Sequence, residues 1–259
     1  MKQRFLTTIL CLSFSAVNAQ ITTTGVVTYQ QVINIYAIQE RDETGTQAKL
    51  FIKNEKSLYI FNRDTMLKTD AVWNRYEGNM DKGYKMVSTD KYGECYLKDL
   101  KTNKLTARQF IKRKVFMVDD TIKPIKWAIK TDTKTFGGYV CQKAEGKYKG
   151  RNYTAWFTTA IPLPTGPWKL CGLPGLILEA YDDKKEVAFY FESIKPLSIQ
   201  DNDVVIVGKG IKITRPQFRA LQESEHEKEL QRLSAPDDRG VTMGVSGNRS
   251  FIDLEMDEN

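Results

Sequence analysis

Apolar and polar residues alternate along most of the chain between residues 26 and 194. A period of two is typical of β-strands with one buried face, and these segments are rich in β-branched and aromatic residues. The expected strands, in chain order, are residues 26–35, 47–53, 57–61, 84–89, 94–98, 106–111, 114–118, 124–129, 135–147, 153–159, 176–181 and 187–194, with 204–207 as a candidate last short strand. Short turns separate them, so we expect a meander of antiparallel neighbours.

Two features interrupt this pattern. Residues 62–82 are irregular and polar, and we expect a long loop there. Gly137 and Gly138 open the strand expected at 135–147. A glycine pair inside a strand predicts a bend or a bulge at that point.

Only one stretch has a helical period. It is expected to run from about residue 215 to residue 234, with Thr214 as the N-cap and Pro216 in the first turn. Its apolar stripe consists of Phe218, Leu221, Leu230 and Leu233. A helix that is apolar on one stripe must cover another surface, so we expect it to cover the open concave face of the sheet.

Together these elements predict a mainly β protein. We expect one large, strongly curved antiparallel sheet, either a half-barrel or an open barrel, with one covering C-terminal α-helix. The expected organisation is a signal peptide at 1–19, a β domain at 20–213, the helix at 214–234 packed on it, and a polar tail at 235–259. In that tail, Phe251, Ile252 and Leu254 would add one edge strand, or else the tail is disordered.

The N-terminus has the features of a signal peptide. Lys2 and Arg4 precede a short apolar run, and an A-x-A-like site ends at Ala19. The run is too short to span a bilayer, and Cys11 lacks the small preceding residue that lipid attachment requires. We therefore expect an exported protein that is periplasmic, associated with the outer membrane or secreted, and that is not transmembrane.

Composition excludes several classes of function. The net charge is +7, but the Lys and Arg residues are scattered, so nucleic-acid binding is not expected. His226 is the only histidine, which excludes a histidine-rich metal site and a Ser-His-Asp triad elsewhere in the chain. The chain has no GxSxG, HExxH, CxxC or P-loop motif. We therefore predict no catalytic residue, no metal site and no cofactor.

A proline- and glycine-rich segment at residues 161–175 separates two of the expected strands. Four of the eight prolines lie in residues 161–174, between glycines and large apolar side chains. Because proline fixes φ and glycine permits positive φ, this composition predicts a rigid loop of defined conformation. The apolar residues Leu176, Ile177 and Leu178 then begin the next strand.

This loop also carries a family resemblance. Residues 172–177 read GLPGLI, the signature that names the GLPGLI family of exported envelope proteins. Other blocks resemble that family in the same order, over about residues 115–195: Ile125-Lys126-Trp127, Gly138 to Ala144, Gly150-Arg151, Ala155 to Thr158, Ile161-Pro162 and Gly166-Pro167. Cys171 departs from the family pattern. The resemblance implies an exported protein with no established enzymatic activity, and a shape similar to the curved sheets of periplasmic lipoprotein carriers.

The aromatic residues of these blocks are candidates for a ligand or partner surface. They are Trp127, Tyr139, Trp156 and Trp168, and Leu173 of the signature belongs with them. One interpretation is that they fill the core of the curved sheet. The other is that they line an apolar cavity for a lipid or acyl chain. We expect Trp168, in the loop, to be the most exposed of them.

Arg151 and Glu179 are the polar residues nearest the signature. They form either a buried ion pair that holds the loop or a contact to a ligand. Cys95, Cys141 and Cys171 remain after export, and an odd count allows at most one bridge within the chain. Because Cys141 and Cys171 both lie in the family blocks, we predict a disulfide between them.

The leading hypothesis is a non-catalytic exported envelope protein that binds an apolar ligand or a protein partner. One alternative is a hydrolase with a site near the GLPGLI loop. Another is a purely structural scaffold of the envelope. A ligand pocket would be apolar and closed, whereas an enzyme needs ionisable groups that converge in a cleft.

Overall fold

The computed structural model describes residues 24–33, 46–61, 75–77, 85–87, 90–196 and 204–234, with the backbone alone at 75–77 and 85–87. The predicted signal peptide, most of the predicted loop at 62–82, the polar tail and the side chain of Leu233 lie outside the described residues.

The described chain consists almost entirely of strands followed by one helix. The elements are β1 (Thr24–Ile33), β2 (Thr46–Lys53), β3 (Lys56–Phe61), β4 (Arg75–Glu77), β5 (Lys85–Val87), β6 (Glu94–Asp99), β7 (Lys104–Ile111), β8 (Lys114–Thr121), β9 (Trp127–Phe136), β10 (Tyr139–Tyr148), β11 (Arg151–Thr158), β12 (Leu176–Asp182), β13 (Val187–Lys195), β14 (Ile211–Thr214) and α1 (Arg215–Ser234). The predicted mainly β class is confirmed.

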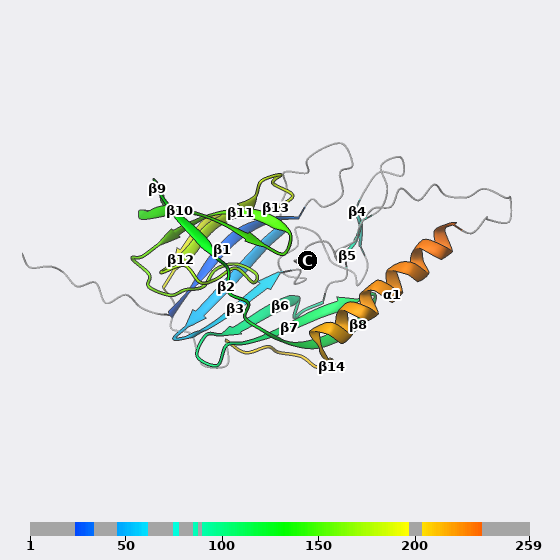
Figure 1. Ribbon diagram of the computed structural model, residues 1–259. Helices are drawn as coiled ribbons and strands as arrows, with labels where there is room; N and C mark the ends of the chain where they lie inside the picture. Colours follow the sequence, from blue (N-terminus) through cyan, green and yellow to red (C-terminus); the bar gives the residue numbers. More distant parts are fainter. Residues whose placement is uncertain are drawn as a thin grey trace, which may run out of the picture.

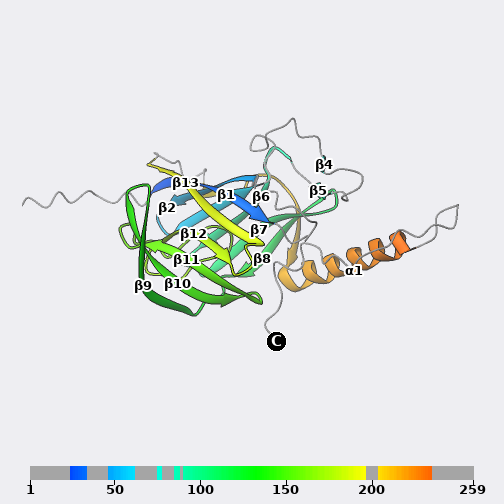
Figure 2. The same ribbon diagram turned by 90° about the horizontal axis from the view of Figure 1, so that it is seen from above.

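Twelve of the strands form one sheet in the order β14-β8-β7-β6-β3-β2-β1-β13-β12-β11-β10-β9, while β4 and β5 pair separately. The centre of the sheet is the antiparallel pair of β1 and β13, with Val27 opposite Ile194. On one side of it lie β1, β2, β3, β6, β7, β8 and β14, the first wing. On the other lie β13, β12, β11, β10 and β9, the second wing. Figures 1 and 2 show the sheet folded over, with the second wing stacked on the first.

The strong curvature follows from one short connection. β8 ends at Thr121 in the first wing and β9 begins at Trp127, the terminal strand of the second wing. The five intervening residues span at most about 20 Å, so the two ends of the sheet must approach each other. The sheet nevertheless stays open, because β9 and β14 are not paired with one another among the described strands.

Three local expectations are wrong. Gly137 and Gly138 do not bend a strand but form the hairpin turn between β9 and β10, with φ of +53° and +85°. Positive φ at both central residues is the geometry that tight hairpins favour, and glycine adopts it without strain. Residues 204–207 are not a strand; the last strand is β14. That strand pairs in parallel with β8, so the sheet is mixed and not purely antiparallel.

Residues 204–210 instead form a strap across the back of the first wing. Val204 is buried with Leu58, Ile60 and Cys95 in a second, smaller apolar cluster. Tyr59 belongs to the main core, and successive strand residues point to opposite faces, so this cluster lies on the other face of the sheet. The strap covers part of the outer face before the chain enters β14.

Aromatic residues of the central strands fill the main core between the wings. The ring of Tyr59 lies edge-on to those of Tyr29 and Phe189, with centroids 6.2 and 6.0 Å apart. The Tyr59 hydroxyl donates to Gln31 at 2.6 Å, and such a bond is what a buried phenol requires.

The helix forms where the sequence predicts it. Thr214 and Gln217 make one half of a capping box, in which the Gln217 side chain accepts from the Thr214 backbone N–H at 3.0 Å; it also accepts from the Thr214 hydroxyl at 2.9 Å. No helix in the described part of the chain is both long enough and apolar enough to cross a bilayer.

The helix does not cover the concave face. Among its described side chains, only Phe218 and Leu221 join the main core, and the Phe218 ring lies 5.5 Å from that of Phe116 on β8. Lys112 and Glu225 form an ion pair at 2.6 Å, and the rest of the helix extends away from the sheet (Figures 1 and 2). The expected covering role is therefore wrong, because the inner face is occupied by another segment.

We expect Phe218 to hold the helix in place. Phe218→Ala should lower the free energy of unfolding by about 3–5 kcal/mol, because it empties a fully buried site. Leu230→Ala, farther along the same stripe and outside the core, should change it by less than about 0.5 kcal/mol. Urea denaturation of both variants makes the comparison, and equal losses would contradict this docking mode.

Candidate functional site

The segment that occupies the inner face is the connection between β11 and β12, residues 159–175, which we call the plug loop. It bonds to both wings. In the first wing, the hydroxyls of Thr165 and Ser57 of β3 lie 2.7 Å apart. In the second wing, the indole N–H of Trp127 on β9 donates to the Cys171 carbonyl at 2.9 Å. The plug loop therefore ties the two wings together from inside.

Lys98 of β6 is the main polar anchor of the plug loop. Its ammonium group donates to the carbonyls of Gly166, at 2.6 Å, and Leu170, at 3.0 Å, and the residue is only 1% exposed. Burial disfavours the charged form and lowers the pKa of Lys98 to about 8. A neutral amine keeps two N–H groups, so both carbonyl bonds survive deprotonation.

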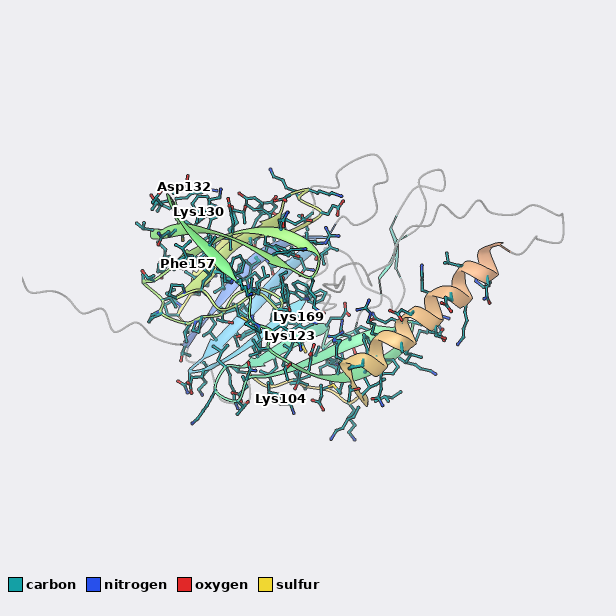
Figure 3. The ribbon with its side chains drawn as sticks, in the orientation of Figure 1. Lys104, Lys123, Lys130, Asp132, Phe157 and Lys169 are labelled. Atoms are coloured by element: carbon teal, nitrogen blue, oxygen red, sulfur yellow. The ribbon has the colours of Figure 1, made fainter. Side chains whose placement is uncertain are left out.

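A second lysine makes the reverse contact: Lys169 of the plug loop reaches into the first wing. Its side chain, labelled in Figure 3, is 2% exposed, and its nitrogen lies 3.6 Å from a carboxylate oxygen of Asp120 on β8. The same oxygen accepts from Arg215 at the start of α1, at 3.2 Å. One carboxylate thus joins the plug loop, a strand near the edge of the sheet and the helix.

Trp168 is buried, although we expected it to be the most exposed aromatic residue of the group. It is 4% exposed, and its ring lies edge-on to Tyr96 of the first wing and Tyr148 of the second, with centroids 6.4 and 5.8 Å apart. Its φ is +49°, which is uncommon for a residue with a side chain. Contacts with both wings hold this backbone conformation in place.

The GLPGLI residues have specific structural roles in the plug loop. Gly172 has φ of +93°, which only glycine adopts readily. Leu173 is buried in the main core. At Gly175, a Cβ atom would lie 2.1 Å from the carbonyl oxygen of Thr158, so only glycine fits against the neighbouring backbone. Pro174 is exposed.

The end of the signature returns the chain to the sheet. Leu176 and Ile177 are fully buried. The Ile177 N–H donates to the Thr165 carbonyl at 2.9 Å, and the Ile177 carbonyl accepts from the Tyr29 hydroxyl at 2.7 Å. Every residue of the motif except the exposed Pro174 is therefore explained by backbone conformation, close approach or core packing.

The structure does not gather the predicted surface residues on one cavity. Trp168 and Leu173 are part of the plug loop, and Trp127 of β9 bonds to it. Trp156 of β11 is half-buried, and its ring packs edge-on to Phe136 at 6.4 Å. Tyr139 of β10 is half-buried against the main core. These positions correspond to the core interpretation of the aromatic residues.

The predicted pair of Arg151 and Glu179 is wrong. Arg151 donates instead to Asp182 and to Glu186, the latter at 2.6 Å, while Glu179 accepts from Lys134 at 3.4 Å. Strand register explains the difference. Tyr153 lies opposite Asp182, which places the preceding residues of β11 beside the β12–β13 turn and not beside Glu179.

The predicted disulfide is absent, because Cys141 and Cys171 are both free, buried thiols. Cys141 lies on β10 opposite Lys134, and Cys171 lies in the plug loop opposite Thr165. Burial raises the pKa of the Cys141 thiol to about 11 and also raises that of Cys171. Neither thiol is therefore activated as a nucleophile. Cys95 is also a free, buried thiol.

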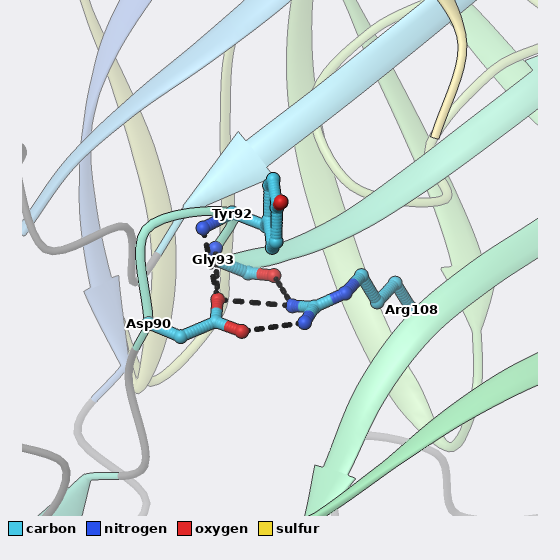
Figure 4. Close-up of polar contacts among 4 residues, drawn as sticks. All are labelled: Asp90, Tyr92, Gly93 and Arg108. Atoms are coloured by element: carbon cyan, nitrogen blue, oxygen red, sulfur yellow. Dashed lines mark hydrogen bonds and ion pairs between the residues drawn. The ribbon is translucent and has the colours of Figure 1, made fainter. Parts of the chain in front are cut away.

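A further buried polar cluster was not predicted. Arg108 of β7 donates to both carboxylate oxygens of Asp90, at 3.1 and 2.5 Å, and to the Gly93 carbonyl (Figure 4). The backbone N–H groups of Tyr92 and Gly93 donate to the same carboxylate. The Asp-Lys-Tyr-Gly turn was the available signal. The Arg108 Nε is buried without a hydrogen-bond partner, but the bonds made by the two terminal nitrogens and by the backbone N–H groups fix the turn that leads into β6.

The described residues contain no group of three or more His, Cys, Asp or Glu side chains placed to hold a metal ion. Two lysines around the plug loop serve to anchor it, because Lys98 donates to its carbonyls and Lys169 pairs with Asp120. Arg151 instead pairs with Asp182 and Glu186, at the turn between β12 and β13.

A family comparison identifies this same region. Residues 145–179 match a family described as "Protein of unknown function (Porph_ging)", which is the GLPGLI-type family. The matched segment runs from the end of β10 through β11 and the plug loop to the first half of β12. The family signature recognised in the sequence is thereby confirmed for this segment.

Comparison with solved structures shows a shared fold. The chain is similar to PNGF-II in two crystal forms. In the P21 form the TM-score is 0.56 at 14% identity, over 79% of this chain and 34% of PNGF-II. In the C2 form it is 0.53 at 13% identity, over 78% and 33%. The chain thus corresponds to about a third of PNGF-II. No curated protein matches it significantly in sequence.

The close approach at Gly175 predicts a sharp contrast within the signature. Gly175→Ala should lower the free energy of unfolding by about 3 kcal/mol, because the added methyl group meets backbone that cannot yield. Pro174→Ala, at the exposed neighbour, should cost less than about 1 kcal/mol. Denaturation curves of both variants test this, and a neutral Gly175→Ala would show that the two backbones are farther apart.

Lys98 predicts a pH dependence of stability. Its folded pKa, about 8, lies below the ordinary 10.5 of the unfolded chain, so the unfolded state binds more protons between these values. The contribution of Lys98 to the free energy of unfolding therefore increases as pH rises through this window, by up to about 1.4 kcal/mol per pH unit.

The measurement compares the wild type with Lys98→Met from pH 7 to pH 9.5. The stability of the wild type relative to the variant should increase over this range. Other titrating groups are present in both proteins, so their contributions to the pH dependence cancel in the difference. The exposed Lys123→Met variant serves as the control. A difference that stays constant with pH would mean that Lys98 is not desolvated.

Proposed function

We propose that this chain, whose GLPGLI segment forms the plug loop, is an exported protein of the cell envelope that acts without catalysis by binding a protein partner on its outer surface. The observation that carries the proposal is the occupancy of the inner face. A curved sheet that carries a small ligand keeps that face open or hollow. Here the chain's own loop fills it.

The choice of a protein partner over an apolar ligand rests on packing. The plug loop places Trp168, Leu170 and Leu173 in the main core, between the wings. Ala155 and Ala180, small residues that would leave room for an acyl chain, are fully buried. An acyl chain would have to displace the plug loop and leave the Gly166 and Leu170 carbonyls without their Lys98 bonds.

The hydrolase alternative receives less support. A hydrolase needs a nucleophile and a base within hydrogen-bonding reach, in a cleft open to substrate. Near the signature, the buried thiol of Cys171 has a raised pKa and the amine of Lys98 is held by two carbonyls. The likeness to PNGF-II concerns the fold of about a third of that protein and carries no activity to this chain.

A fluorescent fatty-acid titration tests the closed interior. We expect no saturable binding to the wild type at any acyl length, because the plug loop occupies the site. Trp168→Ala titrated with benzene is the positive control, since removing a buried indole opens an apolar cavity that takes up small apolar molecules. Saturable binding to the wild type that is lost in Ala155→Phe would contradict the proposal and favour a lipid carrier.

Native mass spectrometry of protein isolated from its own envelope tests the partner. The expected result is a complex with a second polypeptide of defined stoichiometry and no lipid adduct. A stoichiometric lipid adduct on the monomer would overturn the proposal, and a monomer without any partner would favour neither a carrier nor a binding protein.

A further inference from the structure

The terminal strand β14 leaves one of its edges open among the described strands. It pairs with β8 on one side, and the sheet ends on the other. Ile211 is 54% exposed, Lys212 is exposed, and Ile213 is half-buried against the main core. The edge thus presents an apolar, a basic and an apolar side chain in succession, together with unpaired backbone groups on its outer side.

The strap that leads into β14 adds apolar surface beside this edge. Val204 and Ile206 face the small apolar cluster on the sheet. The alternate residues Val205 and Val207 point away from it and are 40% and 53% exposed. Together with Ile211, they make up three of the five large hydrophobic residues that are exposed in the described part of the chain. Ile211 shares its strand face with Ile213, which packs on the main core, so of these three residues only Ile211 belongs to the open edge itself.

The chain itself contains a segment with the complementary pattern. Residues 252–257, outside the described residues, read Ile-Asp-Leu-Glu-Met-Asp. Strict alternation of apolar and charged residues is the pattern of a half-buried strand. Its charges are all acidic, whereas the charged residue of β14 is Lys212.

We propose that residues 252–257 add to the open edge of β14 as an antiparallel strand of the same chain. Placing Glu255 opposite Lys212 puts Leu254 opposite Ile213 and Met256 opposite Ile211. Opposite charges and apolar pairs that face each other across two strands each stabilise a sheet by about 0.2–1 kcal/mol. In this register the Lys209 and Glu258 positions also fall opposite each other.

The chain is long enough for this return. The helix α1 starts directly after β14 and, with 20 residues, is about 30 Å long. Residues 235–251 follow it and span up to about 55 Å when extended. The segment can therefore reach β14 from the far end of the helix. Covering this edge would also prevent edge-to-edge pairing between copies of the protein.

Hydrogen–deuterium exchange of the full chain tests the proposal. The peptide covering residues 208–214 is followed in the wild type and in a variant that ends at residue 244. The outward-facing amides of β14 should exchange at least tenfold faster in the shortened chain. Exchange of the plug loop should stay unchanged, which shows that the fold is intact.

Charge reversal separates strand pairing from a general effect of truncation. Lys212→Glu and Glu255→Lys should each accelerate exchange of β14 several-fold, and the double variant should restore most of the protection. Glu227→Lys, at an exposed position of α1, is the matched control and should have no effect.

Two results would overturn the proposal. Equal exchange of β14 in the full and shortened chains would mean that residues 252–257 do not bind there. Protection that increases with protein concentration, together with a dimer in sedimentation, would mean that the segment pairs with a second copy and not with its own chain.

Discussion

The fold depends on filling the space between two wings of one sheet. A sheet that folds over itself needs side chains, or another segment, to occupy its inner face. Here a loop does so, and a loop brings backbone carbonyls that need partners in the interior. Lys98 of β6 supplies two of those bonds and Trp127 of β9 a third. Because these donors come from different strands, the plug loop also fixes how the wings are arranged.

The same constraint explains the family signature. The glycines are required where the backbone turns through positive φ or touches a neighbouring carbonyl, and the large apolar residues fill the core. The signature therefore describes how the inner face is closed. Under the function proposed here, the positions that recognise a partner lie outside the signature, on the outer surface.

Most of the sheet could be predicted, because apolar and polar residues alternate with a period of two in a strand that has one buried face. The errors arose where tertiary contacts decide. The strap at 204–210 has strand-like residues, but Val204 and Ile206 pack on the back of the sheet, and strand pairing begins only at Ile211. Trp168 was expected to be exposed because loops usually lie on the surface, whereas this loop enters the core. The partner of Arg151 depends on the register of β11 and β12, which the sequence pattern leaves open.

The central claim is that the plug loop is part of the core and not a lid. Native-state hydrogen exchange tests it most directly, at the Leu170 and Gly172 amides of the plug loop and at the Leu176 and Ile177 amides of β12, which donate to plug-loop carbonyls. If the claim is right, these amides exchange only through global unfolding, with the same protection as the amides of β1 and β13. Exchange that is orders of magnitude faster in the plug loop, while β1 and β13 stay protected, would contradict it and show a loop that opens by itself.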